Sequence, residues 1–245
     1  MNLILLEARD HIGASCVTLT DARADHLLNV LQVTPGQTVR VGRLDGPFGT
    51  GTIEAAGDGR VTMRCAFETD TPARPRVDVL LALPRPKVMR RLWAQLAALG
   101  VGRIILTNAS RVERDYFDTH VLTEGCYRPL LIEGLQQARD TRLPLVSIHR
   151  QFRILVEDHL DDLFQSGVRL IAHPSGATSI AEAVTGCNDR VLLAIGPEGG
   201  WNEFEVSLLQ AHRFLPVSLG PRTLRVDTAC TALLALAHSA LAPSG

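Results

Sequence analysis

Residues 195–203 read IGPEGGWNE and stand between the apolar run RVLLA and the segment EFEVSLLQAH. The apolar run predicts a buried strand, and the segment that follows predicts an amphipathic helix. A turn between a strand and a helix needs one or two special residues, but this stretch places three glycines and a proline around a single carboxylate. It therefore predicts a backbone that another molecule approaches closely, and the alternative is an ordinary tight turn.

Further apolar runs of the same kind recur from residue 77 onward, as expected for strands that are buried on both faces. The predicted strands are 77–84, 103–108, 143–149, 168–174, 190–197 and 214–221. Stretches with helical spacing lie between or after them, at 87–100, 119–138, 152–167, 202–212 and 227–242. This alternation predicts an α/β domain built on a parallel sheet.

The first 70 residues have a different pattern, with short alternating runs separated by turn signals such as TPGQ and GDGR. Only 21–31 is helix-like, so this part predicts a small β-barrel. The stretch ETDTPARPR has two prolines and no apolar period, which is typical of a linker. We therefore predict a barrel domain over 1–70, a linker over 71–76 and an α/β domain over 77–245.

Composition limits the class of protein. The chain has 245 residues, of which 46% are hydrophobic and 21% charged, as in ordinary soluble globular proteins. The N-terminus lacks the basic and apolar regions of a signal peptide, and no run reaches membrane-spanning length. The five cysteines form no CxxC pair, so we expect no disulfide framework, no metal site and a cytoplasmic location.

The net charge of −1 conceals an uneven distribution. Residues 77–153 carry 12 basic and 7 acidic side chains, whereas 154–245 carry 5 basic and 10 acidic ones. A positive middle third can hold phosphates on one face. Of the 25 cations, 24 are arginine, which suits bidentate phosphate contacts, although a GC-rich genome produces the same bias.

Three predicted strands end in loops rich in Gly and Pro, with the sequences HPSGATS, GPEGGWNE and GPRTLRVDTA. In parallel sheets, ligands bind outside the carboxyl ends of the strands, so these loops predict a binding site. The P-loop, the GxGxxG fingerprint and the GxSxG elbow are all missing from the sequence. Loops with few charges and many free backbone groups favour a purine-containing ligand over a triphosphate.

The paired motifs IGPEGGWNEFE and LGPRTLRVDTA, with His-Pro at the end of an earlier strand, carry a family resemblance. They resemble the SPOUT-superfamily methyltransferases that modify N3 of a uridine in 16S ribosomal RNA. The N-terminal stretch DHLLNVLQVTPGQ is similar to that family's H…VLR…PG segment, so the resemblance covers essentially the whole chain.

The resemblance implies a trefoil-knotted α/β methyltransferase domain, a PUA-like RNA-binding barrel, bound S-adenosylmethionine and a homodimer. We expect the dimer interface to include part of the knot region and the C-terminal helix, which is apolar nearly all round. The resemblance also implies, position by position, the residues that hold the cofactor. These are His173, Pro174, Ile195, Gly196, Pro197, Glu198, Gly199, Gly200, Leu219, Gly220, Arg222, Leu224, Thr228 and Ala229. In this reading the glycines let the backbone lie against the cofactor.

Methyl transfer to uracil N3 requires alignment, stabilisation of charge on O2 and O4, and removal of the N3 proton. Arg225 is our candidate for stabilising that charge, with an ion pair to Asp227 as the structural alternative. Asp227 is a candidate proton acceptor, although the position also suits a helix N-cap. The partner is expected to be 16S ribosomal RNA in the small ribosomal subunit. The candidate RNA contacts are His26, Arg85, Lys87, Arg111, Gln136, Arg139 and Arg142.

The sequence departs from the family pattern on the substrate side. Gln32 replaces an arginine, and Ala98 and Leu135 each replace a glutamate. These departures leave two alternatives open. One is a methyltransferase for another RNA such as tRNA, and the other is a non-catalytic RNA-binding or ribosome-assembly protein.

Overall fold

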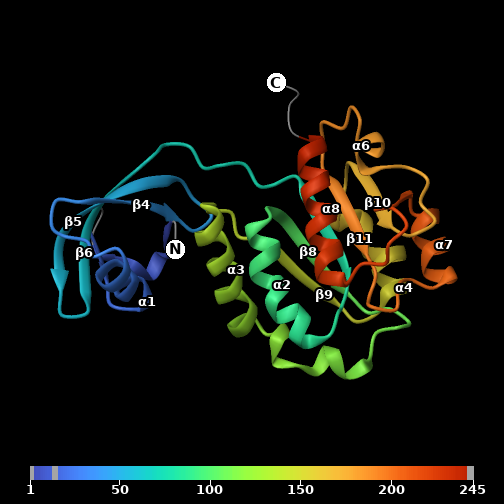
Figure 1. The fold of residues 1–245 in the computed structure, drawn as a ribbon, viewed down its shortest axis with the longest axis horizontal. Helices are drawn as coiled ribbons and strands as arrows, with labels where there is room; N and C mark the ends of the chain where they lie inside the picture. Colours follow the sequence, from blue (N-terminus) through green and yellow to red (C-terminus); the bar gives the residue numbers. More distant parts are fainter. Residues whose placement is uncertain (1–2, 13–15, 242–245) are drawn as a thin grey trace. The chain divides into compact units, whose positions relative to one another are not determined.

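The computed structural model describes residues 3–12 and 16–241, and the chain divides into two compact units (Figure 1). The N-terminal unit combines Met1–Arg74 with Ile132–Leu143, and the C-terminal unit combines Pro75–Leu131 with Pro144–Gly245. The sequence placed all of 77–245 in one domain, whereas the structure groups Ile132–Leu143 with the N-terminal unit. Thr141 explains this grouping: it is fully buried, its hydroxyl donates to the Gly46 carbonyl at 2.7 Å, and its carbonyl accepts the Asp45 amide at 2.7 Å.

The N-terminal unit contains a six-stranded sheet in the order β1-β4-β5-β6-β3-β2. Its strands are β1 (Ile4–Leu6), β2 (His11–Ile12), β3 (Cys16–Leu19), β4 (Thr38–Arg43), β5 (Phe48–Gly57) and β6 (Arg60–Phe67). The β1–β4 pair is parallel, and the other pairs are antiparallel. The helical elements are η1 (Ala8–Asp10), α1 (Ala22–Asp25) and the π-helical η2 (His26–Val30). The predicted segment 21–31 therefore does form a helix, with Asp21 as its N-cap.

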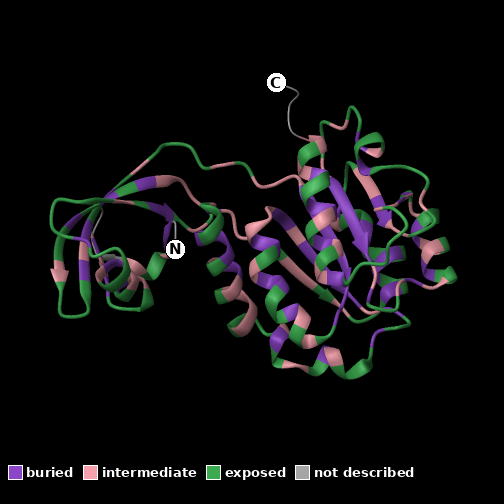
Figure 2. Cartoon of the chain, viewed as in Figure 1, coloured by how far each residue is buried: buried purple, intermediate pink, exposed green. Residues whose placement is uncertain are grey.

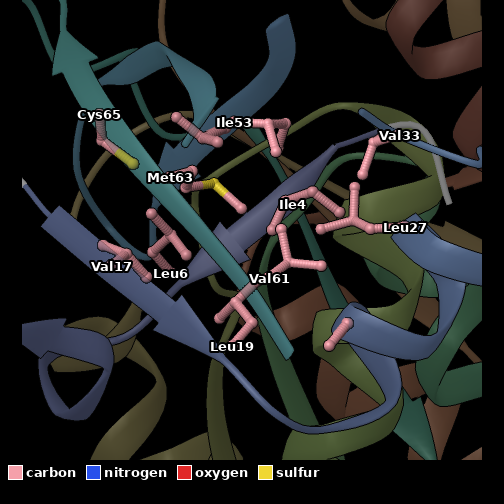
Figure 3. Close-up of a cluster of buried hydrophobic side chains, with 12 residues drawn as sticks. Ile4, Leu6, Val17, Leu19, Leu27, Val33, Ile53, Val61, Met63 and Cys65 are labelled. Atoms are coloured by element: carbon pink, nitrogen blue, oxygen red, sulfur yellow. The ribbon is translucent and has the colours of Figure 1, made fainter. Parts of the chain in front are cut away.

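Alternation along the strands builds the core of this unit. In β6, Val61, Met63 and Cys65 are buried while their neighbours are not. Figure 3 shows these side chains meeting those of β1, β3 and η2, including Leu27. Gly51 on β5 leaves room for this packing, because a Cβ there would lie 2.7 Å from the Met63 sulfur. The period-2 pattern thus gives one apolar face, as expected for a half-buried sheet.

The C-terminal unit is built on a second six-stranded sheet in the order β12-β10-β11-β7-β8-β9. Its strands are β7 (Val77–Ala82), β8 (Val101–Thr107), β9 (Leu145–His149), β10 (Val168–Ala172), β11 (Val191–Ile195) and β12 (Phe214–Val217). Every pairing is parallel, which confirms the predicted mixed α/β fold. The central strands β7 and β11 are buried along their whole length, which Figure 2 shows for β11. Pro216 lies in the edge strand β12, where a missing N–H is tolerated.

Helices fill the connections of this sheet. They are α2 (Pro86–Ala98), η3 (Arg114–Asp118), η4 (His120–Leu122), α3 (Glu124–Ala138), α4 (Phe152–Ile154), η5 (Leu155–His159), α5 (Leu160–Leu163), α6 (Ile180–Ala183), α7 (Glu203–Ala211) and α8 (Val226–Leu241). Trp93 and Leu96 of α2 are fully buried, as their spacing predicted. The C-terminal helix α8 contacts β11, β7, α2 and α6. None of the helices within residues 3–12 and 16–241 has the length and apolar character needed to cross a membrane.

Candidate functional site

The loops that follow β10, β11 and β12 line a pocket of about 310 Å³ within the C-terminal unit, here called the three-loop pocket. The start of α8 and one arginine complete its wall. The lining residues are Arg111, Ala172, His173, Pro174, Ile195, Gly196, Pro197, Glu198, Gly199, Gly200, Trp201, Val217, Ser218, Leu219, Gly220, Arg222, Thr223, Leu224, Val226, Ala229 and Leu233. The structure therefore brings together all the cofactor residues that the motifs predicted except Thr228, an exposed residue in the first turn of α8.

The loop between β11 and α7 is fixed at both ends. Gly200 has a φ of +71° and its amide donates to the Pro197 carbonyl at 2.8 Å, which closes a tight turn. Asn202 and Glu205 then form a capping box that starts α7. Glu205 is only 3% exposed, and its carboxylate also accepts the Ser110 amide at 2.6 Å. This buried glutamate ties the loop after β11 to the loop after β8.

Two of the motif glycines lie close to neighbouring protein atoms. A Cβ at Gly199 would lie 2.9 Å from the Cδ of Arg111, whose Nη1 donates to the Gly199 carbonyl. A Cβ at Gly196 would lie 3.1–3.2 Å from the backbone nitrogen and the indole ring of Trp201. The glycines thus let Arg111 and Trp201 form the wall of the pocket, which is a reason beyond the predicted approach of a ligand.

Trp201 also lines the three-loop pocket, although it is not among the cofactor residues that the motifs predicted. It is 5% exposed and packs against Phe152 with ring centroids 5.4 Å apart, so within its own unit it is a wall residue. Within the described residues its indole Nε1 has no hydrogen-bond partner. A buried donor without a partner is costly, and a polar atom of a bound ligand would relieve that cost.

Backbone hydrogen bonds join the loop after β10 to the loop after β12. The His173 amide donates to the Val217 carbonyl at 3.0 Å, and the Ser218 amide donates to the Thr178 carbonyl at 3.3 Å. Gly220 has a φ of +95°, and its amide donates to the Ser218 hydroxyl at 3.1 Å. The His173 ring is itself held, with Nδ1 2.7 Å from the Ser175 hydroxyl. These bonds join the two loops along one side of the pocket.

The two predicted catalytic residues lie beside the pocket without lining it. The Arg225 side chain is 74% exposed, with Nε 3.6 Å from the Asp227 carboxylate. Asp227 is the second residue of α8, so it lies inside the first turn and is not the N-cap that the sequence favoured. Its carboxylate accepts the Thr228 amide at 3.0 Å and pairs with Arg91 at 3.2 Å. Asp227 therefore stabilises the start of α8.

Glu198 has a defined structural partner. Its carboxylate accepts the Arg85 amide at 3.1 Å, at the N-terminus of α2. Glu198 precedes α7 in the chain, yet its carboxylate lies at the start of α2, a different helix. Arg85 offers no side-chain cap of its own, so Glu198 supplies one.

The predicted RNA contacts divide between the two units. Arg85 and Lys87 are exposed at the start of α2, and Arg111 is exposed at the pocket wall. The others belong to the N-terminal unit, namely His26, Gln136, Arg139 and Arg142.

The four predicted RNA-contact residues of the N-terminal unit have different surroundings. Gln136 is 7% exposed, and Arg142 donates to the Asp45 carbonyl at 2.9 Å, which gives both a packing role. Arg139 is exposed with a φ of +59°, and His26 is half-buried with no partner for Nε2 among the described residues.

With this geometry established, comparisons identify the family. Residues 71–238 match the family described as the RNA methyltransferase domain. The chain is 30% identical to ribosomal RNA small subunit methyltransferase E of Treponema pallidum, an alignment that spans 98% of this chain and 92% of that protein. It is 24% identical to ribosomal RNA small subunit methyltransferase E 1 of Borreliella burgdorferi, over 98% and 99% of the two chains. The chain therefore belongs to the RNA methyltransferase domain family, in which it groups with the ribosomal RNA small subunit methyltransferase E proteins.

Solved structures share the fold. Ribosomal RNA small subunit methyltransferase E from Neisseria gonorrhoeae, bound to S-adenosyl methionine, superposes with a TM-score of 0.76 at 20% identity, covering 98% of this chain and 97% of that one. A methyltransferase from Legionella pneumophila, in complex with the same cofactor, gives a TM-score of 0.73 at 23% identity over 98% and 97%. At these identities the likeness establishes the fold alone.

Proposed function

We propose that this chain is an S-adenosylmethionine-dependent methyltransferase that modifies N3 of a uridine in 16S ribosomal RNA of the small ribosomal subunit. The observation that carries this proposal is the three-loop pocket, which gathers the predicted cofactor motifs at one edge of a parallel sheet. The relatives named above support the substrate, because their names assign them to small-subunit ribosomal RNA. Action on ribosomes also implies a cytoplasmic location.

The residues of the pocket fit this cofactor. A volume of about 310 Å³ lies at the lower end of the range of roughly 300–1,000 Å³ that is usual for small-molecule sites. Leu219, Leu224 and Ile195 supply an apolar wall for an adenine ring, and Trp201 offers a buried N–H. Among the residues that the structure describes, no three His, Cys, Asp or Glu side chains are grouped to hold a metal ion. S-adenosylmethionine bound here supplies a methyl group already activated on a sulfonium.

The protein must then position the uracil and stabilise negative charge on O2 and O4 as the N3 proton leaves. Arg225 remains our sequence-based candidate, and it follows Leu224, a lining residue. The structure adds Arg111, which is also exposed but is part of the pocket wall and is held by the Gly199 carbonyl. An arginine fixed in this way keeps further N–H donors for an anionic base. Asp227 is already paired with Arg91 and its own helix, which makes it a less available proton acceptor.

Two alanine variants separate these candidates. We expect Arg111→Ala to lower kcat by about 100-fold, the usual scale for loss of one oxyanion donor, and Arg225→Ala to have a smaller effect. The rates are compared at saturating S-adenosylmethionine, because Arg111 also lines the cofactor pocket, whereas Arg225 does not and its loss should leave cofactor affinity within a few fold. The reverse order of the two kcat losses would return the role to Arg225.

We also propose the finer fold features that the family resemblance implies. The trefoil knot is supported by the path of the chain: β12 lies at the sheet edge, yet α8 returns to contact β11 and β7. The PUA-like barrel is supported by the antiparallel pairing of β4, β5 and β6, with an irregularity between Ile53 and Ala55 of the kind that bends a strand.

The structure weakens one departure from the family pattern as an argument for a different substrate. Leu135 is 1% exposed, so this position is packed in the interior and does not face a substrate. Its change from glutamate therefore gives little reason to propose a different RNA. Gln32 is exposed, with a φ of +50°, so this departure can still affect the choice of substrate.

The direct test is transfer of labelled methyl groups from S-adenosylmethionine to small ribosomal subunits that lack the modification, followed by identification of the nucleoside. The proposal predicts N3-methyluridine in 16S RNA. Methylated tRNA with unmodified 16S RNA would instead support the alternative substrate, and no transfer despite cofactor binding would support a non-catalytic role.

A further inference from the structure

A second pocket of about 320 Å³ lies in the C-terminal unit, at the carboxyl ends of β8 and β9. It is lined by Asn108, Arg114, Phe117, Asp118 and Arg150, and is here called the β8–β9 pocket. We propose that it binds a backbone phosphate of the substrate RNA, next to the nucleotide that enters the three-loop pocket. This inference rests on the proposed function for the identity of the polymer, and on geometry for the phosphate.

The position of the β8–β9 pocket relates it to the three-loop pocket. Both lie at the carboxyl edge of the same parallel sheet, where ligands of such folds bind. A single segment, residues 108–118, contributes Arg111 to the first pocket and most of the lining of the second. A polymer whose reacting base enters one pocket therefore has its backbone directed along this segment.

The Arg150 side chain is held in place by hydrogen bonds that leave some of its N–H donors available for an anion. Its Nη2 donates to the Phe117 carbonyl and to the Asp118 carboxylate, both at 2.9 Å, and its guanidinium lies over the Phe117 ring at 5.7 Å. Both bonds use one nitrogen, so the N–H groups on Nε and Nη1 are directed elsewhere. The side chain is 62% exposed, so these donors are accessible to a ligand from solvent.

The other lining groups favour phosphate over a base. Arg114 adds a second guanidinium, and the Asn108 amide has donors to offer because its Oδ1 already accepts the Ala109 amide at 2.9 Å. The pocket lining contains two arginines and one aspartate, so its net charge is positive. Arg150 covers the one aromatic ring, which is itself only 6% exposed, so a base finds little surface for stacking. The N–H donors of arginine match the geometry of phosphate oxygens.

The test compares Arg114→Ala, Arg150→Ala and the double variant with Arg153→Ala. Arg153 is a matched control because it is 70% exposed, pairs with Glu157 and lines neither pocket. Binding of 16S RNA is measured against salt concentration by filter binding, and methyl transfer to small subunits is measured in parallel. We expect the double variant to weaken RNA binding roughly tenfold, with a salt slope about one unit flatter for each lost phosphate contact.

Cofactor affinity should stay within about twofold, since the lining of the three-loop pocket is untouched. A purely structural role for Arg150 would lower the unfolding midpoint without changing the salt slope. Arg114→Ala keeps the test valid if Arg150→Ala unfolds, because Arg114 is exposed at the first position of η3.

The outcomes of the two measurements are distinguishable. Variants with the RNA affinity and salt slope of Arg153→Ala would overturn the inference even if the wild type methylates 16S RNA. Weakened, flatter binding in a protein that methylates nothing would support the phosphate site and refute the proposed function. A wild type that does not bind RNA would refute both.

Discussion

Gly199 shows at the scale of one residue how the motif builds the pocket. The sequence signals that its backbone is approached closely, and the structure identifies the neighbour as Arg111, whose Nη1 donates to the Gly199 carbonyl. Because the two residues are far apart in the chain, no local pattern connects them. The motif therefore predicted which residues line the three-loop pocket, but it did not predict why each of them is required.

We expect Gly199→Val to lower affinity for S-adenosylmethionine at least tenfold. A Cβ there already lies 2.9 Å from Arg111 Cδ, so a branched side chain displaces the arginine and narrows the pocket. Calorimetry with the cofactor measures the effect. Gly125→Val is the control, since a Cβ at Gly125 meets nothing within 4 Å. Equal affinity in the wild type and Gly199→Val would contradict our description of this wall.

Trp201 and Glu205 mark the limit of prediction from sequence at this scale. An aromatic residue after Gly-Gly is compatible with a surface, a lid or a wall, and only its packing against Phe152 decides between them. Glu205 looks like one more charge on an amphipathic helix, yet it is buried and accepts the Ser110 amide. Both roles depend on contacts between segments that the sequence does not place side by side.

At the scale of elements, continuous apolar runs predicted the strands of the parallel sheet because those strands are buried on both faces. The 4-residue α6 was missed, since one turn of helix has no apolar period. The helix α3 was predicted, but its membership of two units was not. The pattern of a helix is local, whereas this division depends on Thr141 bonding to the loop at Asp45 and Gly46.

The helix α8 gives a pH-dependent prediction. Burial lowers the pKa of His238 below its ordinary value of 6.5, and the backbone carbonyls of Gly100 and Leu99 oppose this only in part. Below pH 6.5 the unfolded chain then binds more protons than the folded chain, so the free energy of unfolding falls as the pH drops. The pKa of His149 is also lowered, by burial and by the neighbouring His159, so this histidine changes the free energy of unfolding with pH in the same direction.

Urea unfolding at about pH 7.5 and about pH 5.5 measures this effect. We expect the wild type to be less stable at the lower pH and His238→Gln to show a smaller difference between the two conditions. An unchanged pH dependence in His238→Gln would mean that the histidine is hydrated in the folded protein.

At the scale of the whole molecule we propose a homodimer through the C-terminal unit. Large apolar side chains remain exposed on it, including Leu236 of α8 at 48% and Phe204 of α7 at 57%. Light scattering at micromolar concentration should give twice the 26.6 kDa of one chain. Leu236→Glu should favour the monomer, whereas Val30→Glu in the N-terminal unit should not. A single 26.6 kDa species for the wild type would contradict the proposal.

Nucleoside mass spectrometry of ribosomal RNA tests most directly whether the protein methylates uridine N3 in 16S ribosomal RNA. RNA is compared from cells with the gene, cells without it, and cells without it that express the Gly199→Val variant. We predict N3-methyluridine in 16S RNA from the first cells, none in 16S RNA from cells without the gene, and a marked loss in cells that express Gly199→Val. The same amount of N3-methyluridine in 16S RNA with and without the gene would contradict the account.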